Sequence, residues 1–196
     1  MLQKGLMFLQ VLVLLVAPAA RAGNEPPSSA KDSTREPSPA EVWVTWKGAE
    51  PDKGASAWYL KRFVRHDVRF REVDAGLLDL GAGMPFDVPQ ADFRRTHKLA
   101  VYEQLLRAYP VTDPVARRLG DIIHDIEINL WQPKKFVESS VIETAALEYS
   151  KSRVDGSIPL PCYVAWFELI YSALQENGAL AIAPPFPVEC GARSKD

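Results

Sequence analysis

The chain has 196 residues, of which 47% are hydrophobic and 24% charged, and its formal net charge is −2. A chain of this length and composition can bury one hydrophobic core. Because the charge balance is slightly acidic, there is no overall basic field for DNA or RNA, and we expect no nucleic-acid partner.

The N-terminal segment has the layout of a secretory signal peptide. Lys4 precedes a predominantly apolar run over residues 6–16, and small residues follow up to Ala22. The run is too short to cross a bilayer, so we expect cleavage near Ala22, a periplasmic or secreted protein, and no membrane anchor. Residues 23–40 are rich in Pro, Ser and charge, which predicts a disordered linker, and residues 41–196 are expected to form a single domain.

The first half of that domain reads as strand, helix, strand. Residues 41–46 and 68–73 alternate as strands, and residues 53–64 carry one apolar stripe at helical spacing. Short connections favour a right-handed crossover and a small parallel pair of strands. Residues 75–98 are irregular, with room for one more short strand around Phe86.

The second half reads as helical. Helices are predicted from about 99 to 109, from Pro114 with Asp113 as its cap, from 136 to 152, and from 161 to 178. The last helix is apolar nearly all round, which predicts the central buried helix. We therefore expect a mixed α/β (α+β) fold, with a small parallel or mixed sheet in the N-terminal half and a mainly helical C-terminal half.

Cys162 and Cys190 are the only cysteines in the sequence. In an oxidising compartment two cysteines most often pair, and neither has the C-x-x-C spacing of a redox or soft-metal site. We expect a structural disulfide.

Two clusters of cations are candidate oxyanion sites. On the first helix, Trp58, Lys61, Arg62 and Arg65 are expected to lie together, away from the apolar stripe. Residues 94–98 include Arg94, Arg95, His97 and Lys98 and precede a helix whose N-terminus adds backbone donors. Salt bridges on a solvated surface are the alternative interpretation of both clusters.

The helix that starts at Pro114 carries a candidate metal or proton-transfer site. Asp121, His124 and Asp125 are three and four residues apart, so their side chains can converge on one face. The alternative is an ordinary solvated helix face.

Three segments carry a family resemblance. They read DKGASAWYLKRF at 52–63, GMPFDVP at 83–89 and IHDIE at 123–127. In this order and at these spacings they resemble the ChrB-type chromate-resistance domain, also called the chromate resistance exported protein, from about Val44 to Tyr149. The matched positions with chemical capacity are Asp52, Trp58, Arg62, Asp87, His124, Asp125 and Glu127.

The resemblance implies a role in chromate resistance. Some members of the family are cytoplasmic regulators with a DNA-binding region ahead of the domain; this chain has a signal-peptide pattern and a linker there, so the regulatory role is not carried over. Relatives often open the helix after the P-F-D turn with a Cys-Thr-Phe-Glu-like sequence. Here residues 99–103 read LAVYE, so that cysteine is absent.

These observations lead to three hypotheses. The leading one is a periplasmic domain that binds or senses an oxyanion such as chromate. Its oxyanion-binding residues are Lys61, Arg62, His97 and Trp58. A divalent metal ion is the candidate cofactor, and its expected ligands are His124, Asp125, Asp121 and Glu127. The alternatives are a metal-dependent enzyme with His124 and Asp121 or Asp125 as ligands, and a protein-interaction module.

Overall fold

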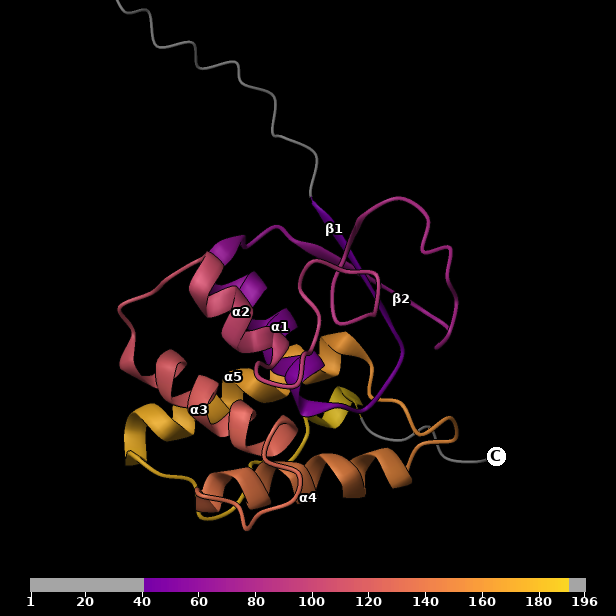
Figure 1. The fold of residues 1–196 in the computed structure, drawn as a ribbon. Helices are drawn as coiled ribbons and strands as arrows, with labels where there is room; N and C mark the ends of the chain where they lie inside the picture. The colour runs from indigo at the N-terminus through magenta and orange to yellow at the C-terminus, as the bar shows by residue number, and fades with distance from the viewer. Residues whose placement is uncertain (1–40, 191–196) are drawn as a thin grey trace, which may run out of the picture. The chain divides into compact units, whose positions relative to one another are not determined.

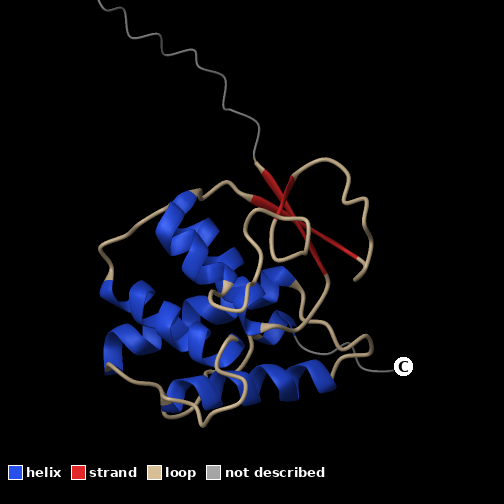
Figure 2. Ribbon diagram, in the orientation of Figure 1, coloured by secondary structure: helices blue, strands red, loops and turns tan. Residues whose placement is uncertain are grey.

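The computed structural model describes residues 41–190, so the predicted signal peptide and linker lie outside the described residues. Three strands, β1 (Val42–Trp46), β2 (Arg69–Val73) and β3 (Met84–Pro85), form a parallel sheet in the order β2-β1-β3. The sheet lies to one side of the helices (Figures 1 and 2). The predicted fold class is confirmed, and so is the strand–helix–strand unit with its parallel pair.

Five α-helices make up most of the rest of the domain. Their bounds are α1 (Pro51–Tyr59), α2 (Val101–Ala108), α3 (Pro114–Glu127), α4 (Val137–Lys151) and α5 (Leu160–Asn177). A π-helical turn, η1 (Leu60–Val64), continues α1, and a short 3-10 helix, η2 (Val188–Cys190), ends the described chain. As the sequence predicts, Asp113 caps α3 by accepting a hydrogen bond from the Ala116 amide at 2.8 Å.

The helix enclosed on all sides is α1, which corrects the prediction that the last helix holds this place. All nine residues of α1 are buried, including Asp52 and Lys53, whereas Leu169 of α5 is 41% exposed. Gly54 makes this possible, because a Cβ atom there would lie 2.4 Å from the Tyr163 ring of α5. The absence of a side chain thus lets α1 and α5 pack in close contact.

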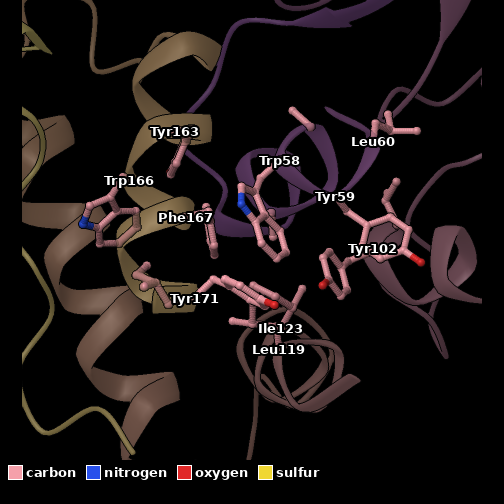
Figure 3. Packing of buried hydrophobic residues seen from close by; sticks show 14 of the residues in the cluster. Trp58, Tyr59, Leu60, Tyr102, Leu119, Ile123, Tyr163, Trp166, Phe167 and Tyr171 are labelled. Carbon is pink, nitrogen blue, oxygen red and sulfur yellow. The ribbon is translucent and has the colours of Figure 1, made fainter. Parts of the chain in front are cut away.

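The core between α1 and α5 is aromatic, as Figure 3 shows. The Trp58 ring lies 5.1 Å from that of Tyr171 and 5.6 Å from that of Phe63, measured between centroids. Trp58 is only 1% exposed. The expectation that it lies away from the apolar stripe is therefore wrong: α2, α3 and α5 cover α1 so completely that it has no solvated face.

The predicted disulfide is confirmed. Cys162, in the first turn of α5, is bonded to Cys190 of η2, and their Cα atoms are 5.6 Å apart. The bond ties the extended C-terminal segment back onto the helical core. Among residues 41–190, no helix combines the length and apolarity needed to cross a membrane.

Candidate functional site

The carboxyl ends of the three parallel strands meet at one edge of the sheet, where a cavity of about 450 Å³ lies. Its lining residues are Trp46, Lys47, Glu50, Lys53, Ala75, Asp87, Val88, Pro89, Arg94 and Arg95. We call this cavity the carboxyl-edge pocket. The chain leaves β1 toward β2, whereas β3 lies on the other side of β1, so the strand order reverses beside the pocket. Open α/β sheets bind ligands in such crevices.

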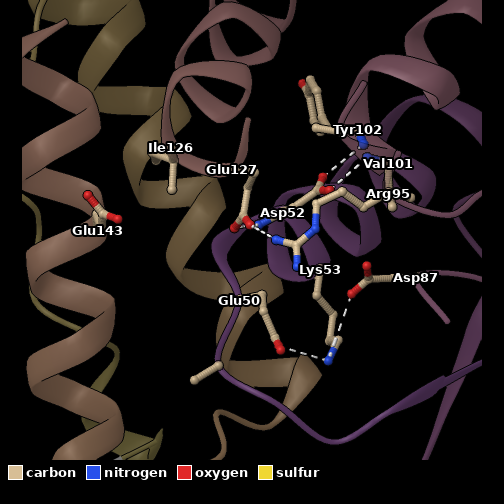
Figure 4. A network of polar contacts seen from close by, with 12 residues as sticks. Glu50, Asp52, Lys53, Asp87, Arg95, Val101, Tyr102, Ile126, Glu127 and Glu143 are labelled. Atoms are coloured by element: carbon tan, nitrogen blue, oxygen red, sulfur yellow. Dashed lines mark hydrogen bonds and ion pairs between the residues drawn. The ribbon is translucent and has the colours of Figure 1, made fainter. Parts of the chain in front are cut away.

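Lys53 forms the base of this pocket. It lies in the first turn of α1 and is only 2% exposed. Its Nζ lies 3.0 Å from Glu50 Oε2 and 3.8 Å from Asp87 Oδ2, so that the ammonium sits between two carboxylates (Figure 4). A buried charge requires such partners.

Asp87 follows β3 and has an unusual backbone. Its φ of 52° is left-handed, and no other non-glycine residue in the described part of the chain has a positive φ. Such strain is stored mainly at functional sites. Burial is the main cause that raises the pKa of Asp87 to about 7; Lys53 and Arg95 oppose the rise, and the carboxylates of Glu50 and Glu127 add to it. Near neutral pH this carboxyl group can therefore gain or lose a proton.

Asp52 and Glu127 form a network of hydrogen bonds and an ion pair next to the pocket (Figure 4). The Asp52 carboxylate accepts hydrogen bonds from the amides of Val101 at 2.6 Å and Tyr102 at 2.8 Å, at the N-terminus of α2. Glu127 Oε1 accepts from the Asp52 amide at 3.2 Å, and its Oε2 is ion-paired with Arg95. Burial raises the pKa of both carboxyl groups, that of Asp52 to well above its usual range.

Three matched family positions, Asp52, Asp87 and Glu127, thus meet around this pocket although they are far apart in the sequence. Sequence reasoning missed Lys53 and Glu50. One signal was available for Lys53: a cation in the first turn of a helix opposes the helix dipole, so its presence there needs a specific reason.

The cation cluster at 94–98 is divided by the fold. Arg94 and Arg95 line the carboxyl-edge pocket, whereas His97 and Lys98 are exposed and do not line it. The α2 N-terminus that was expected to supply anion-binding donors already binds the Asp52 carboxylate. That part of the expectation is wrong, because a buried side chain of α1 takes those donors.

Three of the four predicted oxyanion-binding residues line a second cavity, of about 650 Å³. Its lining residues are Trp58, Lys61, Arg62, Phe63, His66, Pro161, Val164, Ala165 and Glu168, and we call it the Arg62 pocket. Glu168 Oε1 is ion-paired with Arg62 Nη1 at 2.5 Å, and Glu168 Oε2 accepts from Trp58 Nε1 at 2.8 Å. The guanidinium also lies over the Tyr171 ring, 4.3 Å from its centroid. Glu168 therefore engages both principal donors of this pocket.

The four predicted metal ligands are not brought together. His124 Nδ1 lies 2.9 Å from Glu103 Oε2, Glu127 faces Arg95, and Asp121 is exposed. Within residues 41–190 no group of three or more His, Cys, Asp or Glu side chains is arranged to hold a metal ion.

Asp125 was predicted as a metal ligand, with an ordinary solvated helix face as the alternative, and the structure places it in neither setting. Asp125 is 1% exposed, because the loop between α3 and α4 folds over it. Its carboxylate accepts hydrogen bonds from Asn129 Nδ2 at 2.8 Å and from the Lys135 amide at 2.7 Å. These bonds fix the loop and help to hold the pKa of Asp125 below its usual value, although burial acts in the opposite direction.

Comparison with known proteins supports the resemblance seen in the sequence. The family model for the ChrB C-terminal domain matches residues 43–174, which include the sheet, α1 to α4 and most of α5. No curated protein and no solved structure matches the chain significantly. The match covers more than half of the chain and all the residues of the carboxyl-edge pocket. The chain is thus a chromate-resistance-associated protein that belongs to the ChrB C-terminal domain family.

Proposed function

We propose that this domain binds a small oxyanion in the carboxyl-edge pocket, with chromate as the candidate ligand. The observation that carries the proposal is the meeting of Lys53, Arg94 and Arg95 at the carboxyl edge of the parallel sheet. The family's association with chromate resistance supplies the candidate. Chromate is a tetrahedral dianion, which charge-assisted hydrogen bonds from lysine and arginine suit.

The charges around the pocket favour an anion. The lining residues include four basic and two acidic side chains. Arg94 Nη1 donates to the Ala91 carbonyl at 2.7 Å, and Arg95 Nη1 is paired with Glu127, which leaves each guanidinium with further N–H groups for a ligand. Arg94 and Arg95 follow each other in the loop after β3, so they can contact the same small anion.

Export from the cytoplasm is part of the proposal. The signal-peptide pattern before Ala22 supports it, as does the Cys162–Cys190 disulfide, because such bonds persist in oxidising compartments. In that location, chromate that enters the cell would reach the domain before it reaches the cytoplasm.

The Arg62 pocket is the second candidate location for the oxyanion. Trp58, Lys61 and Arg62 line it together, as a binding site built from the predicted residues requires. An anion there would compete with Glu168, which binds both Arg62 and Trp58, whereas in the carboxyl-edge pocket Arg94 has no ion-pair partner within residues 41–190. A metal-dependent enzyme finds less support, because its expected ligands His124 and Asp125 face separate partners and Asp121 is exposed.

The test is isothermal titration of the purified protein with chromate and with sulfate. We expect the Arg94→Gln/Arg95→Gln double variant to bind at least about tenfold more weakly than wild type, since each charge-assisted hydrogen bond contributes about 1.5–3 kcal/mol. The matched control is Arg62→Gln, which removes one arginine from the other pocket and should leave binding unchanged.

Two results would contradict the proposal. Absence of binding by the wild-type protein would remove the oxyanion function altogether. Loss of binding in Arg62→Gln, with full binding by the double variant, would move the site to the Arg62 pocket.

A further inference from the structure

Asp87 is the acidic group of the carboxyl-edge pocket whose charge is least compensated. Apart from Arg94, the other charged residues that line the pocket each take part in an ion pair. The closest of these pairs are Lys47 with Asp74, Lys53 with Glu50, and Arg95 with Glu127. Within residues 41–190 Arg94 has no ion-pair partner, and Asp87 shares Lys53 with Glu50 at the longer distance of 3.8 Å. These four cations face the carboxyl groups of Glu50, Asp74, Asp87 and Glu127, so the proton on Asp87 decides whether the eight side chains together have a net positive charge or none.

The position of the Asp87 carboxyl group is fixed by its backbone. The Asp87 amide donates to the Phe93 carbonyl at 2.8 Å, and Phe86 forms a β-bridge with Phe93. These contacts hold the left-handed φ of 52° and keep the carboxyl group in the pocket lining. Its nearest cation, Lys53 Nζ, is 3.8 Å away, which is too far for a hydrogen bond. Within the described residues the carboxyl oxygens accept no hydrogen bond, so they remain available to a ligand.

Both acids and cations lie around this group. The charged groups that surround Asp87 come from the start of α1, from the loop after β3 and from α3. They are Glu50, Asp52, Lys53, Arg94, Arg95 and Glu127. With the side chain only 14% exposed, water cannot screen the repulsion among these carboxylates well. Burial and this repulsion raise the pKa of Asp87 to about 7.

We propose that the carboxyl-edge pocket takes up its oxyanion together with a proton, and that Asp87 carries this proton. A charged Asp87 would repel a dianion in the same cavity. A protonated Asp87 leaves the charge of Arg94 uncompensated and offers an O–H donor to an oxyanion oxygen. This inference rests on the proposed function, and it assigns Asp87 as the residue that sets the pH range of binding.

Sulfate is the probe that tests this coupling, because it stays a dianion across the neutral range whereas chromate itself takes up a proton there. In isothermal titration we expect the wild-type affinity for sulfate to fall by roughly tenfold per pH unit above about pH 7. Titration in two buffers of different ionisation enthalpy should show up to one proton taken up per sulfate bound on the alkaline side.

The variant is Asp87→Asn, because asparagine is neutral at every pH and tolerates the left-handed backbone that position 87 requires. We expect it to bind sulfate with an affinity that no longer depends on pH and without proton uptake. The matched control, Asp74→Asn, removes an acid that is 84% exposed near the same pocket and should keep the wild-type pH profile.

The outcomes separate this inference from the proposed function. If Asp87→Asn binds sulfate with the wild-type pH profile and proton uptake, Asp87 does not carry the proton, although the oxyanion site stands. If the folded variant has lost binding at low pH as well, Asp87 serves another role and the inference is overturned. If neither protein binds sulfate or chromate at any pH, the proposed function itself fails.

Discussion

Lys53 occupies a place in the first turn of α1 where the partial positive charge of the helix N-terminus disfavours a cation. Its 2% exposure makes that place still less favourable. The structure compensates with Glu50 at 3.0 Å and Asp87 at 3.8 Å. Such an arrangement costs stability unless it is well paired, so we interpret it as retained for ligand binding.

The raised pKa of Asp87 has a consequence for stability that needs no ligand. Between the usual aspartate pKa of 3.8 and about 7, the folded protein holds a proton that the unfolded chain has lost. The stability that Asp87 contributes is therefore fully present below about pH 4 and is lost as pH rises to about 7.

We predict that the unfolding free energy of wild type, minus that of Asp87→Asn, falls across this pH range. The slope is at most about 1.4 kcal/mol per pH unit. Urea unfolding followed by circular dichroism at several pH values measures it. The same series on Asp74→Asn shows how much any lost surface carboxylate contributes, and equal slopes for the two variants would contradict the prediction.

At the scale of elements, α1 contributes to both pockets. Its Lys53 lines the carboxyl-edge pocket, and its Trp58 lines the Arg62 pocket. Its close packing against α5 depends on Gly54. A methyl group there would lie 2.4–2.8 Å from Cδ1, Cγ and Cβ of Tyr163, whose position is fixed by α5.

We predict that Gly54→Ala lowers the unfolding free energy by about 1–3 kcal/mol through overpacking, despite the better helix propensity of alanine. Gly120→Ala in α3 is the matched control. There the new methyl group would meet the end of the flexible Leu106 side chain at 2.7 Å, so we expect a change below about 1 kcal/mol. Urea titration of both variants decides the question, and equal losses would show that the α1–α5 contact at Gly54 is no more sensitive to an added methyl group than the control position in α3.

Most elements were predictable because each has its own periodicity. The predicted helix at 53–64 begins at Pro51 in the structure, and the one expected at 99–109 shortens to Val101–Ala108. The π-helical turn at Leu60–Val64, which carries Arg62, has no sequence signal of its own. Helix faces were less predictable, since Trp58 is buried by α5, which is distant in the sequence, and Asp125 by the way the α3–α4 loop folds back.

At the scale of the whole molecule, the Cys162–Cys190 bond anchors the C-terminal segment to α5. The cysteines are 28 residues apart, and in the chain-entropy model a loop of that size stabilises the fold by about 3–4 kcal/mol.

We predict that Cys162→Ala/Cys190→Ala loses about this amount of unfolding free energy in urea, while binding at the carboxyl-edge pocket, whose lining residues do not include either cysteine, is retained in the folded protein. Wild type unfolded under reducing conditions is the control and should match the double variant. A double variant as stable as oxidised wild type would show that packing alone holds the C-terminal segment.

The sequence by itself determined the order and type of the elements, the parallel pair, the disulfide and the family. Each of these depends on local periodicity, on a short motif or on a count of cysteines. Three family positions that the motifs identified, Asp52, Asp87 and Glu127, also proved to belong to the polar network of the carboxyl-edge pocket.

Only the tertiary structure decided which charges meet. Glu127 contacts Asp52 across 75 residues of sequence, and Glu168 contacts Trp58 across 110. Ion pairing, burial and the resulting pKa values depend on distances of a few ångströms between such segments, and no local pattern encodes those distances. For that reason the motifs identified carboxylates with chemical capacity, but only the fold showed that Asp87 lies beside a buried lysine at the carboxyl edge of a parallel sheet and that Asp52 and Glu127 bond to each other nearby.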